Sequence, residues 1–268
     1  MSQIDMLINK IKDNKSSSSK YNKINGIDGL LWINLDSSKD RKKKMKKTIK
    51  KIDVTKIRIS GVDGLNYNVI DNFIENKNDL KQVSNLKNTE LALTLSHFKV
   101  FDTIKNLSGK YFMVCEDDIS LENVKYFNLN LKDIIKNSPD FDILTLYKTK
   151  LNKLDNMYTD LNKYNKVEKY DHIWGSVAYI ITKKFAKKLS SIIKYNSITN
   201  KFIINTDKEI SQSDVFVFSL GKTFVYKYNF ISTGISKSLI HLNDAKCHKN
   251  LHEKSIINQL KYILADFT

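Results

Sequence analysis

The 268-residue sequence contains very little arginine, proline or cysteine. Arg41 and Arg58 are its two arginines, so lysine supplies nearly all of the 45 basic residues behind the net charge of +16. Proteins that read bases and phosphates depend on the forked guanidinium of arginine, so this composition argues against a nucleic-acid partner. Lysine spread along the chain, with many Asn and Ile, is typical of an AT-rich genome, such as that of a bacterium or a large DNA virus. A positive field would still attract anionic substrates.

Long apolar runs and paired cysteines are also missing. No stretch approaches the roughly 20 apolar residues that span a bilayer, and the first residues lack the apolar segment and cleavage site of a signal peptide. Cys115 and Cys247 have neither metal-type spacing nor a disulfide framework. These absences predict a soluble, cytoplasmic protein in a reducing compartment, with an oligomeric state that they leave open.

Strand-like apolar stretches alternate with helix-like amphipathic stretches along most of the chain. The predicted strands cover 30–35, 55–60, 111–115, 143–147, 176–182 and 223–228. The predicted helices cover 1–12, 90–106, 123–137, 184–193, 209–219 and 250–264, with a further basic helix carrying Met45, Ile49 and Ile52. Polar linkers or loops are expected at 16–19, 151–170 and 195–208. This alternation predicts an α/β fold with a mostly parallel central sheet flanked by helices.

The same pattern predicts three segments. Residues 1–27 form an N-terminal amphipathic helix and polar linker, residues 28–241 form the main domain, and residues 242–268 form a C-terminal helical appendage.

Three consecutive acids, Glu116, Asp117 and Asp118, follow the apolar strand at 111–115. In an extended segment alternate side chains share a face, so Glu116 and Asp118 can point the same way. Two carboxylates together with diphosphate oxygens and water would suit Mn²⁺ or Mg²⁺. A solvated acidic turn is the competing interpretation, and the apolar strand before the acids favours the metal.

Several short segments in a fixed order resemble glycosyltransferase family 25, which includes lipooligosaccharide and procollagen galactosyltransferases. The segments are 32–41 (WINLDSSKDR), 62–64 (VDG), 90–97 (ELALTLSH), 116–118 (EDD), 174–179 (WGSVAY) and Asp214. The resemblance covers roughly residues 29–240 and implies a GT-A type fold, a UDP-sugar donor, a divalent metal and inversion at the anomeric carbon. Thr89, Ala92 and Leu93 depart from the glycine and cysteine that relatives usually carry there.

The resemblance also implies roles for individual residues. Nucleotide-sugar contacts are expected from Asn34, Arg41, Asp63, Glu90, Ser96, Asp117, Trp174 and Gly175; metal ligands from Glu116, Asp118 and His241; and catalytic roles for Asp214, Asp118 and His97. Asp214 is the candidate general base, which would deprotonate the acceptor hydroxyl.

Most of these residues also have a structural interpretation. Arg41 and His241 can be surface side chains, Asp63 a turn former, and Glu90 a favourable charge at a helix start. His97 can be a structural hydrogen-bonding group, and Asp214 an acid near a helix start without chemistry. Trp174 and Gly175 are expected to floor the acceptor site with Tyr179, for which core packing is the alternative.

The sequence therefore predicts a metal-dependent inverting glycosyltransferase that moves galactose or glucose from UDP-galactose or UDP-glucose to a hydroxyl. The acceptor would be a glycan or glycoprotein, including a collagen-like hydroxylysine. The alternatives are a catalytically degenerate binding module and a metal-dependent phosphohydrolase. A phosphohydrolase of the haloacid-dehalogenase type requires the motif Asp-x-Asp with the first Asp as nucleophile. Glu116 stands in that position here, which argues against this alternative.

Overall fold

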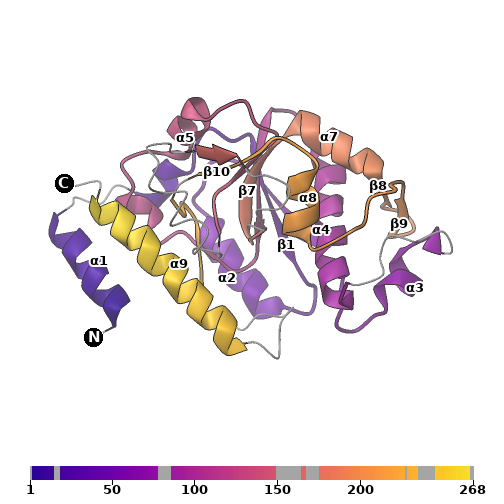
Figure 1. Cartoon of the computed structure of the whole chain (residues 1–268), viewed down its shortest axis with the longest axis horizontal. Helices are drawn as coiled ribbons and strands as arrows, with labels where there is room; N and C mark the ends of the chain where they lie inside the picture. The colour runs from indigo at the N-terminus through magenta and orange to yellow at the C-terminus, as the bar shows by residue number, and fades with distance from the viewer. Residues whose placement is uncertain are drawn as a thin grey trace.

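The computed structural model describes residues 2–14, 19–77, 86–148, 164–166, 175–226, 228–234 and 245–265. Its centre is a seven-stranded sheet in the order β2-β1-β3-β7-β5-β10-β6 (Figure 1). The strands are β1 (Gly29–Asn34), β2 (Thr55–Ser60), β3 (Tyr111–Glu116), β5 (Ile143–Thr145), β6 (Tyr164–Lys166), β7 (Ala178–Thr182) and β10 (Thr223–Tyr226). β7 and β6 run against the other five. The predicted mostly parallel α/β sheet is confirmed.

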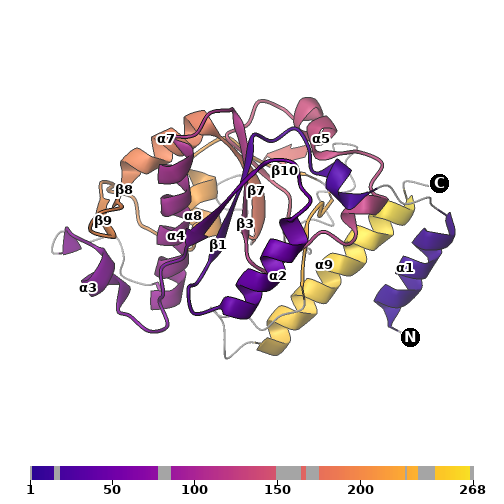
Figure 2. The same ribbon diagram turned by 180° about the vertical axis from the view of Figure 1, so that it is seen from behind.

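Helices cover both faces of the sheet because the strands are apolar on both. On β1, Leu30 and Trp32 join one hydrophobic core, while Leu31 and Ile33 join the other. The first core includes side chains of α2 (Lys39–Ile49), α5 (Leu131–Asn137) and α9 (Ala245–Ala265). The second includes side chains of α3 (Val69–Phe73), α4 (Asn88–Ile104), α7 (Lys183–Ile192) and α8 (Ser213–Ser219). Figures 1 and 2 show these two layers of helices from opposite sides.

The two ends of the described chain lie side by side. Helix α1 (Gln3–Asn14) packs against α9 (Figure 2), and Ile11, Leu260 and Ile263 are buried in the same core as β1 and α2. None of the described helices is long and apolar enough to cross a membrane.

The structure corrects several predicted boundaries. The helix predicted at 123–137 is a 3-10 turn, η3 (Val124–Tyr126), followed by α5, which begins where the Asn130 side chain caps it. The polar loop predicted at 195–208 contains a hairpin of β8 (Ile193–Asn196) and β9 (Lys201–Ile204), because Phe202 and Ile204 bury alternate side chains. The loop predicted at 151–170 contains β6, and the rest of that stretch lies outside the described residues.

Candidate functional site

The site lies at one edge of the sheet, where the parallel strands β1, β2 and β3 end at Asn34, Ser60 and Glu116. The antiparallel strand β7 begins at this edge, and the backbone N–H of Glu116 donates to the carbonyl of Val177 at 2.9 Å. Ligands of open α/β sheets bind beyond the carboxyl ends of the strands. The chain order therefore brings the three acids to the edge where a ligand is expected.

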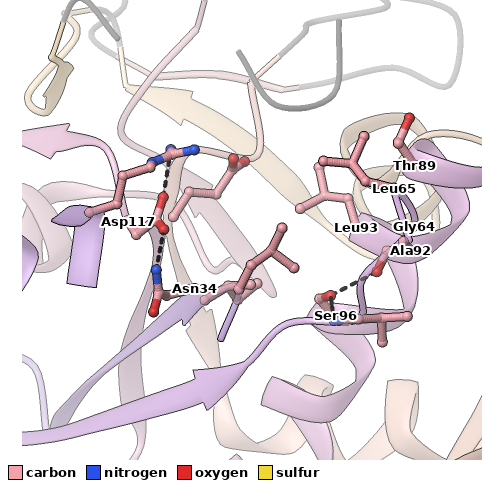
Figure 3. A pocket seen from close by; sticks show the side chains of 13 residues that line it. Asn34, Gly64, Leu65, Thr89, Ala92, Leu93, Ser96 and Asp117 are labelled. Atoms are coloured by element: carbon pink, nitrogen blue, oxygen red, sulfur yellow. Dashed lines mark hydrogen bonds and ion pairs between the residues drawn. The ribbon is translucent and has the colours of Figure 1, made fainter. Parts of the chain in front are cut away.

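A pocket that is partly open to solvent occupies this edge; its free space, counting the part that is open solvent, is about 530 Å³. It is lined by Ile33, Asn34, Leu35, Arg41, Val62, Gly64, Leu65, Thr89, Ala92, Leu93, Ser96, Glu116 and Asp117. Figure 3 shows Asn34 and Asp117 on one side of the pocket and Leu65, Thr89 and Leu93 on the other. One wall is thus polar and charged, and the opposite wall is mostly apolar.

Asp117 anchors the polar wall. Its Oδ2 accepts a hydrogen bond from Nδ2 of Asn34 at 2.6 Å, and its Oδ1 lies 2.5 Å from the guanidinium of Arg41 (Figure 3). Arg41 also lies 3.1 Å from Oδ2 of Asp118. Arg41, predicted to contact the nucleotide, lines the pocket and in this structure pairs with two of the three acids.

The acids are buried more deeply than their charge would favour. Burial and the nearby charge of Asp118 raise the pKa of Glu116 to about 8, although Arg41 and Ser176 act in the opposite direction. Burial likewise raises the pKa of Asp117 and of Asp118, and Arg41 partly offsets both shifts. Oδ1 of Asp118 is buried, and no residue in the described part of the chain gives it a hydrogen bond. The cluster therefore has less positive charge around it than three ionised carboxylates require.

A divalent cation fits the chemistry of Glu116 and Asp118, because carboxylate oxygens are the ligands that Mn²⁺ and Mg²⁺ prefer. The buried Oδ1 of Asp118, which has no partner within the described ranges, supports that fit. Within the described ranges, no three His, Cys, Asp or Glu side chains form a group that could hold a metal ion. Two carboxylates would then be the protein's share, with ligand oxygens and water as the rest. His241, the third expected ligand, lies outside the described residues.

Asp214 lies near the acids and is tied to the backbone. Its Oδ2 accepts from the N–H of Gly175 at 2.8 Å, and its Oδ1 accepts from the N–H of Val215 at 3.0 Å. Burial raises the pKa of Asp214 in spite of these two bonds. Beside Gly175, the hydroxyl of Ser176 donates to Oε1 of Glu116 at 3.1 Å. Asp214 and Glu116 are thus linked through two adjacent residues just before β7.

His97 and Ser96 occupy the buried side of α4. Nδ1 of His97 lies 2.8 Å from the hydroxyl of Tyr179, and burial lowers the pKa of His97 to about 3. His97 does not line the pocket described above. Ser96 does, and its Oγ accepts from the backbone N–H of Val62 at 2.8 Å while donating to the carbonyl of Ala92. Both therefore make structural contacts, and Ser96 also shapes the pocket wall.

Asp63 and Glu90 make local contacts near the pocket. Oδ1 of Asp63 accepts from the N–H groups of Leu65 and Asn66, which forms a turn. Glu90 accepts from the N–H of Lys87 at the start of α4. Trp174 lies outside the described residues.

Sequence reasoning missed three residues that support the site. Arg58 binds Asn34, and Ser176 bridges Glu116 to the hydroxyl of Ser213, 2.9 Å away. The rarity of arginine was a usable signal for Arg58, because only two of the 45 basic residues in this chain are arginine. Ser213 carried no such signal, because its role depends on how β7 and α8 meet.

Comparison with protein families identifies this chain's relatives. The family model described as glycosyltransferase family 25 (LPS biosynthesis protein) matches residues 28–208, a range that contains the whole pocket and the three acids. A search of curated proteins found no match.

Proposed function

The chain belongs to glycosyltransferase family 25 and has the GT-A type α/β fold which that family implies, and from this premise we propose a UDP-sugar-dependent hexosyl transfer. The proposed donor is UDP-galactose or UDP-glucose. The proposed acceptor is a hydroxyl on a glycan or on a collagen-like hydroxylysine, and the anomeric configuration is inverted.

One observation carries the proposal: a pocket at the strand ends joins an apolar wall to buried, under-compensated acids. A nucleotide sugar has the complementary layout, with a flat base at one end and a diphosphate at the other. Leu65 and Leu93 would pack against the base and ribose, and Arg41 at the other wall would contribute positive charge to the diphosphate.

Glu116 and Asp118 would hold the Mn²⁺ or Mg²⁺ ion, which when bound neutralises charge on the departing diphosphate. The chain's own acids explain why such an ion is favoured there. Burial disfavours the negative charge on each of these carboxyl groups, and contact with a cation would favour it.

Asp214 is the proposed general base. In an inverting transfer the acceptor oxygen attacks the anomeric carbon, the bond from that carbon to the diphosphate oxygen breaks, and the acceptor proton passes to the base. A pKa raised by burial makes this carboxylate a better proton acceptor than an exposed aspartate. The two backbone N–H groups hold it in a fixed position.

A catalytically degenerate binding module is the second candidate, and one observation favours it. Arg41 already pairs with Asp117 and Asp118, so a cationic side chain stands where a metal would be expected to help. Such a module would bind a nucleotide or glycan without turnover.

Thermal unfolding of the purified protein with UDP, with and without Mn²⁺, tests the shared part of both candidates. A ligand that binds the native state alone raises the melting temperature. We expect a shift with UDP that grows with Mn²⁺, and UDP release from UDP-galactose or UDP-glucose in the presence of a hydroxyl acceptor. A shift without any release would support the binding module, and no shift with either ligand would contradict both.

A further inference from the structure

A chain of polar contacts reaches the acid cluster from strand β2. Arg58 lies on β2, next to Trp32 of β1 in the parallel register. Its guanidinium donates to Oδ1 of Asp36 at 2.5 Å, to the carbonyl of Asn34 at 3.0 Å and, through Nε, to Oδ1 of Asn34 at 2.9 Å. Three bonds from one planar group fix its position, which a lysine at the same place could not reproduce.

The bond from Nε helps to fix which way the Asn34 amide points, together with the carbonyl of Ser38, to which Nδ2 donates at 3.3 Å. Arginine donates and never accepts, so it selects the amide oxygen and turns Nδ2 toward Asp117. Nδ2 then donates to Oδ2 of Asp117 at 2.6 Å. A flipped amide would place its oxygen against a carboxylate and its NH₂ against a guanidinium, so both neighbours oppose the flip.

Asp117 transmits this orientation to Arg41. With Oδ2 held by Asn34, its Oδ1 is directed at the guanidinium of Arg41, 2.5 Å away. Arg41 in turn reaches Oδ2 of Asp118 and not Oδ1, which has no hydrogen-bond partner among the described residues. Nη2 of Arg41 makes both contacts, so a displacement of Asp117 would move the same atom that pairs with Asp118.

We infer that Arg58, which does not line the pocket, is a positioning residue for the site: through the Asn34 amide it fixes Asp117 and Arg41 and so leaves Glu116 and Oδ1 of Asp118 for the ligand. This inference deepens the proposed glycosyl transfer and rests on it for its catalytic meaning. The geometry it describes is independent of any reaction.

The first test reads that geometry without a ligand. The side-chain amide protons of Asn34 are assigned by NMR from the signals lost in Asn34→Ala, and their exchange with solvent is measured in wild type and in Arg58→Gln. A proton bonded to a carboxylate exchanges slowly, and loss of one charge-assisted bond should speed its exchange about tenfold. Unchanged exchange in a folded Arg58→Gln protein would overturn the inference.

The second test is a double-mutant cycle on Mn²⁺ affinity, measured from free Mn²⁺ by electron paramagnetic resonance. Asn34→Ala and Arg58→Gln should each weaken binding about tenfold, and the double variant should be no weaker than Asn34→Ala alone. Effects that simply add would show that Arg58 does not act through Asn34.

Two controls keep the outcomes distinct. Lys222→Gln removes another basic side chain from an ion pair. Lys222 pairs with Asp140 just before β10 and β5 begin, at the sheet edge opposite the site, so neither readout should change. If Arg58→Gln does not fold, Asp36→Asn removes one anchor of the same guanidinium from an exposed position and takes its place. Wild type that binds neither Mn²⁺ nor UDP would contradict the proposed function, and the exchange measurement would still decide the role of Arg58.

Discussion

Gly175 donates its backbone N–H to Oδ2 of Asp214 at 2.8 Å from a left-handed backbone conformation, with φ at +138°. A Cβ at this position would lie 2.9 Å from a ring carbon of Tyr147, so glycine is required both by conformation and by space. The bond joins α8 to the residue that precedes Ser176, the partner of Glu116. The candidate base and the acid cluster are thus held by one short turn.

Gly175→Ala should therefore lower the free energy of unfolding by about 1–3 kcal/mol, because it forces a side chain into a strained conformation. It should also reduce UDP and Mn²⁺ binding, since Ser176 moves with the turn. Chemical denaturation and the ligand-induced thermal shift measure the two effects. Gly61→Ala is the control for the stability effect alone, because its added Cβ meets Leu35 of the pocket wall at 3.2 Å but needs no left-handed backbone. An equal loss of stability in both variants would contradict this explanation.

Glu116→Gln and Asp118→Asn keep the shape of the side chains and remove the negative charge. We expect turnover to fall at least about a hundredfold, because electrostatic stabilisation of the departing group is usually the largest catalytic contribution. The melting temperature should change little, because burial raises the pKa of both carboxyl groups and so already disfavours the negative charge that the substitutions remove. UDP release and thermal unfolding check the two parts. Full activity in both variants would refute the assignment of these acids to a metal site.

His97 gives the folded protein a defined sensitivity to acid. Its pKa is about 3 in the folded state against 6.5 in the unfolded chain, so below pH 6.5 the unfolded chain binds a proton that the folded protein does not. Stability is therefore lost as pH falls from 6.5 toward 3, by about 2 kcal/mol at pH 5. His97→Gln should remove this loss. Urea unfolding of both proteins at pH 7.5 and pH 5 tests it, and equal losses on acidification would show that other groups are responsible.

Ser96→Ala should destabilise the protein by about 1–3 kcal/mol, because it leaves the buried N–H of Val62 without an acceptor. The pocket wall at Val62 should shift, so the KM for the donor should rise more than kcat falls. Thr103→Ala is the control on the same helix, since Thr103 Oγ1 makes the same bond back to the helix carbonyl four residues earlier and accepts nothing described from another element. Comparable effects in the two variants would mean that the helix bond, and not Val62, matters.

Much of the fold could be predicted from the sequence because each core strand is a short apolar run between polar segments. The strands β1 and β3 were predicted nearly to the residue, since Leu30–Ile33 and Phe112–Cys115 are buried without exception. The helix predicted at 123–137 was wrong because periodicity does not reveal that Asn130 caps a new helix. The β8–β9 hairpin was missed because two buried side chains, Phe202 and Ile204, lie among polar residues.

The acids of the site were predictable because a strand delivers them to the sheet edge, a purely local pattern. Their supports were not, because each support comes from a distant part of the chain. Arg58 meets Asn34 across 24 residues and Ser176 meets Glu116 across 60. Pairing of this kind depends on strand order, which the sequence alone left open.

The packing of α1 against α9 has a consequence for how the protein forms. The 230 residues from 15 to 244 separate the two helices, so α1 leaves the ribosome long before the surface that covers it exists. Until then Ile11, fully buried in the finished fold, is exposed on a short helix that is marginal in isolation. Closure of α1 onto α9 should be among the last events of folding, and contacts between elements so far apart along the chain are slow to form.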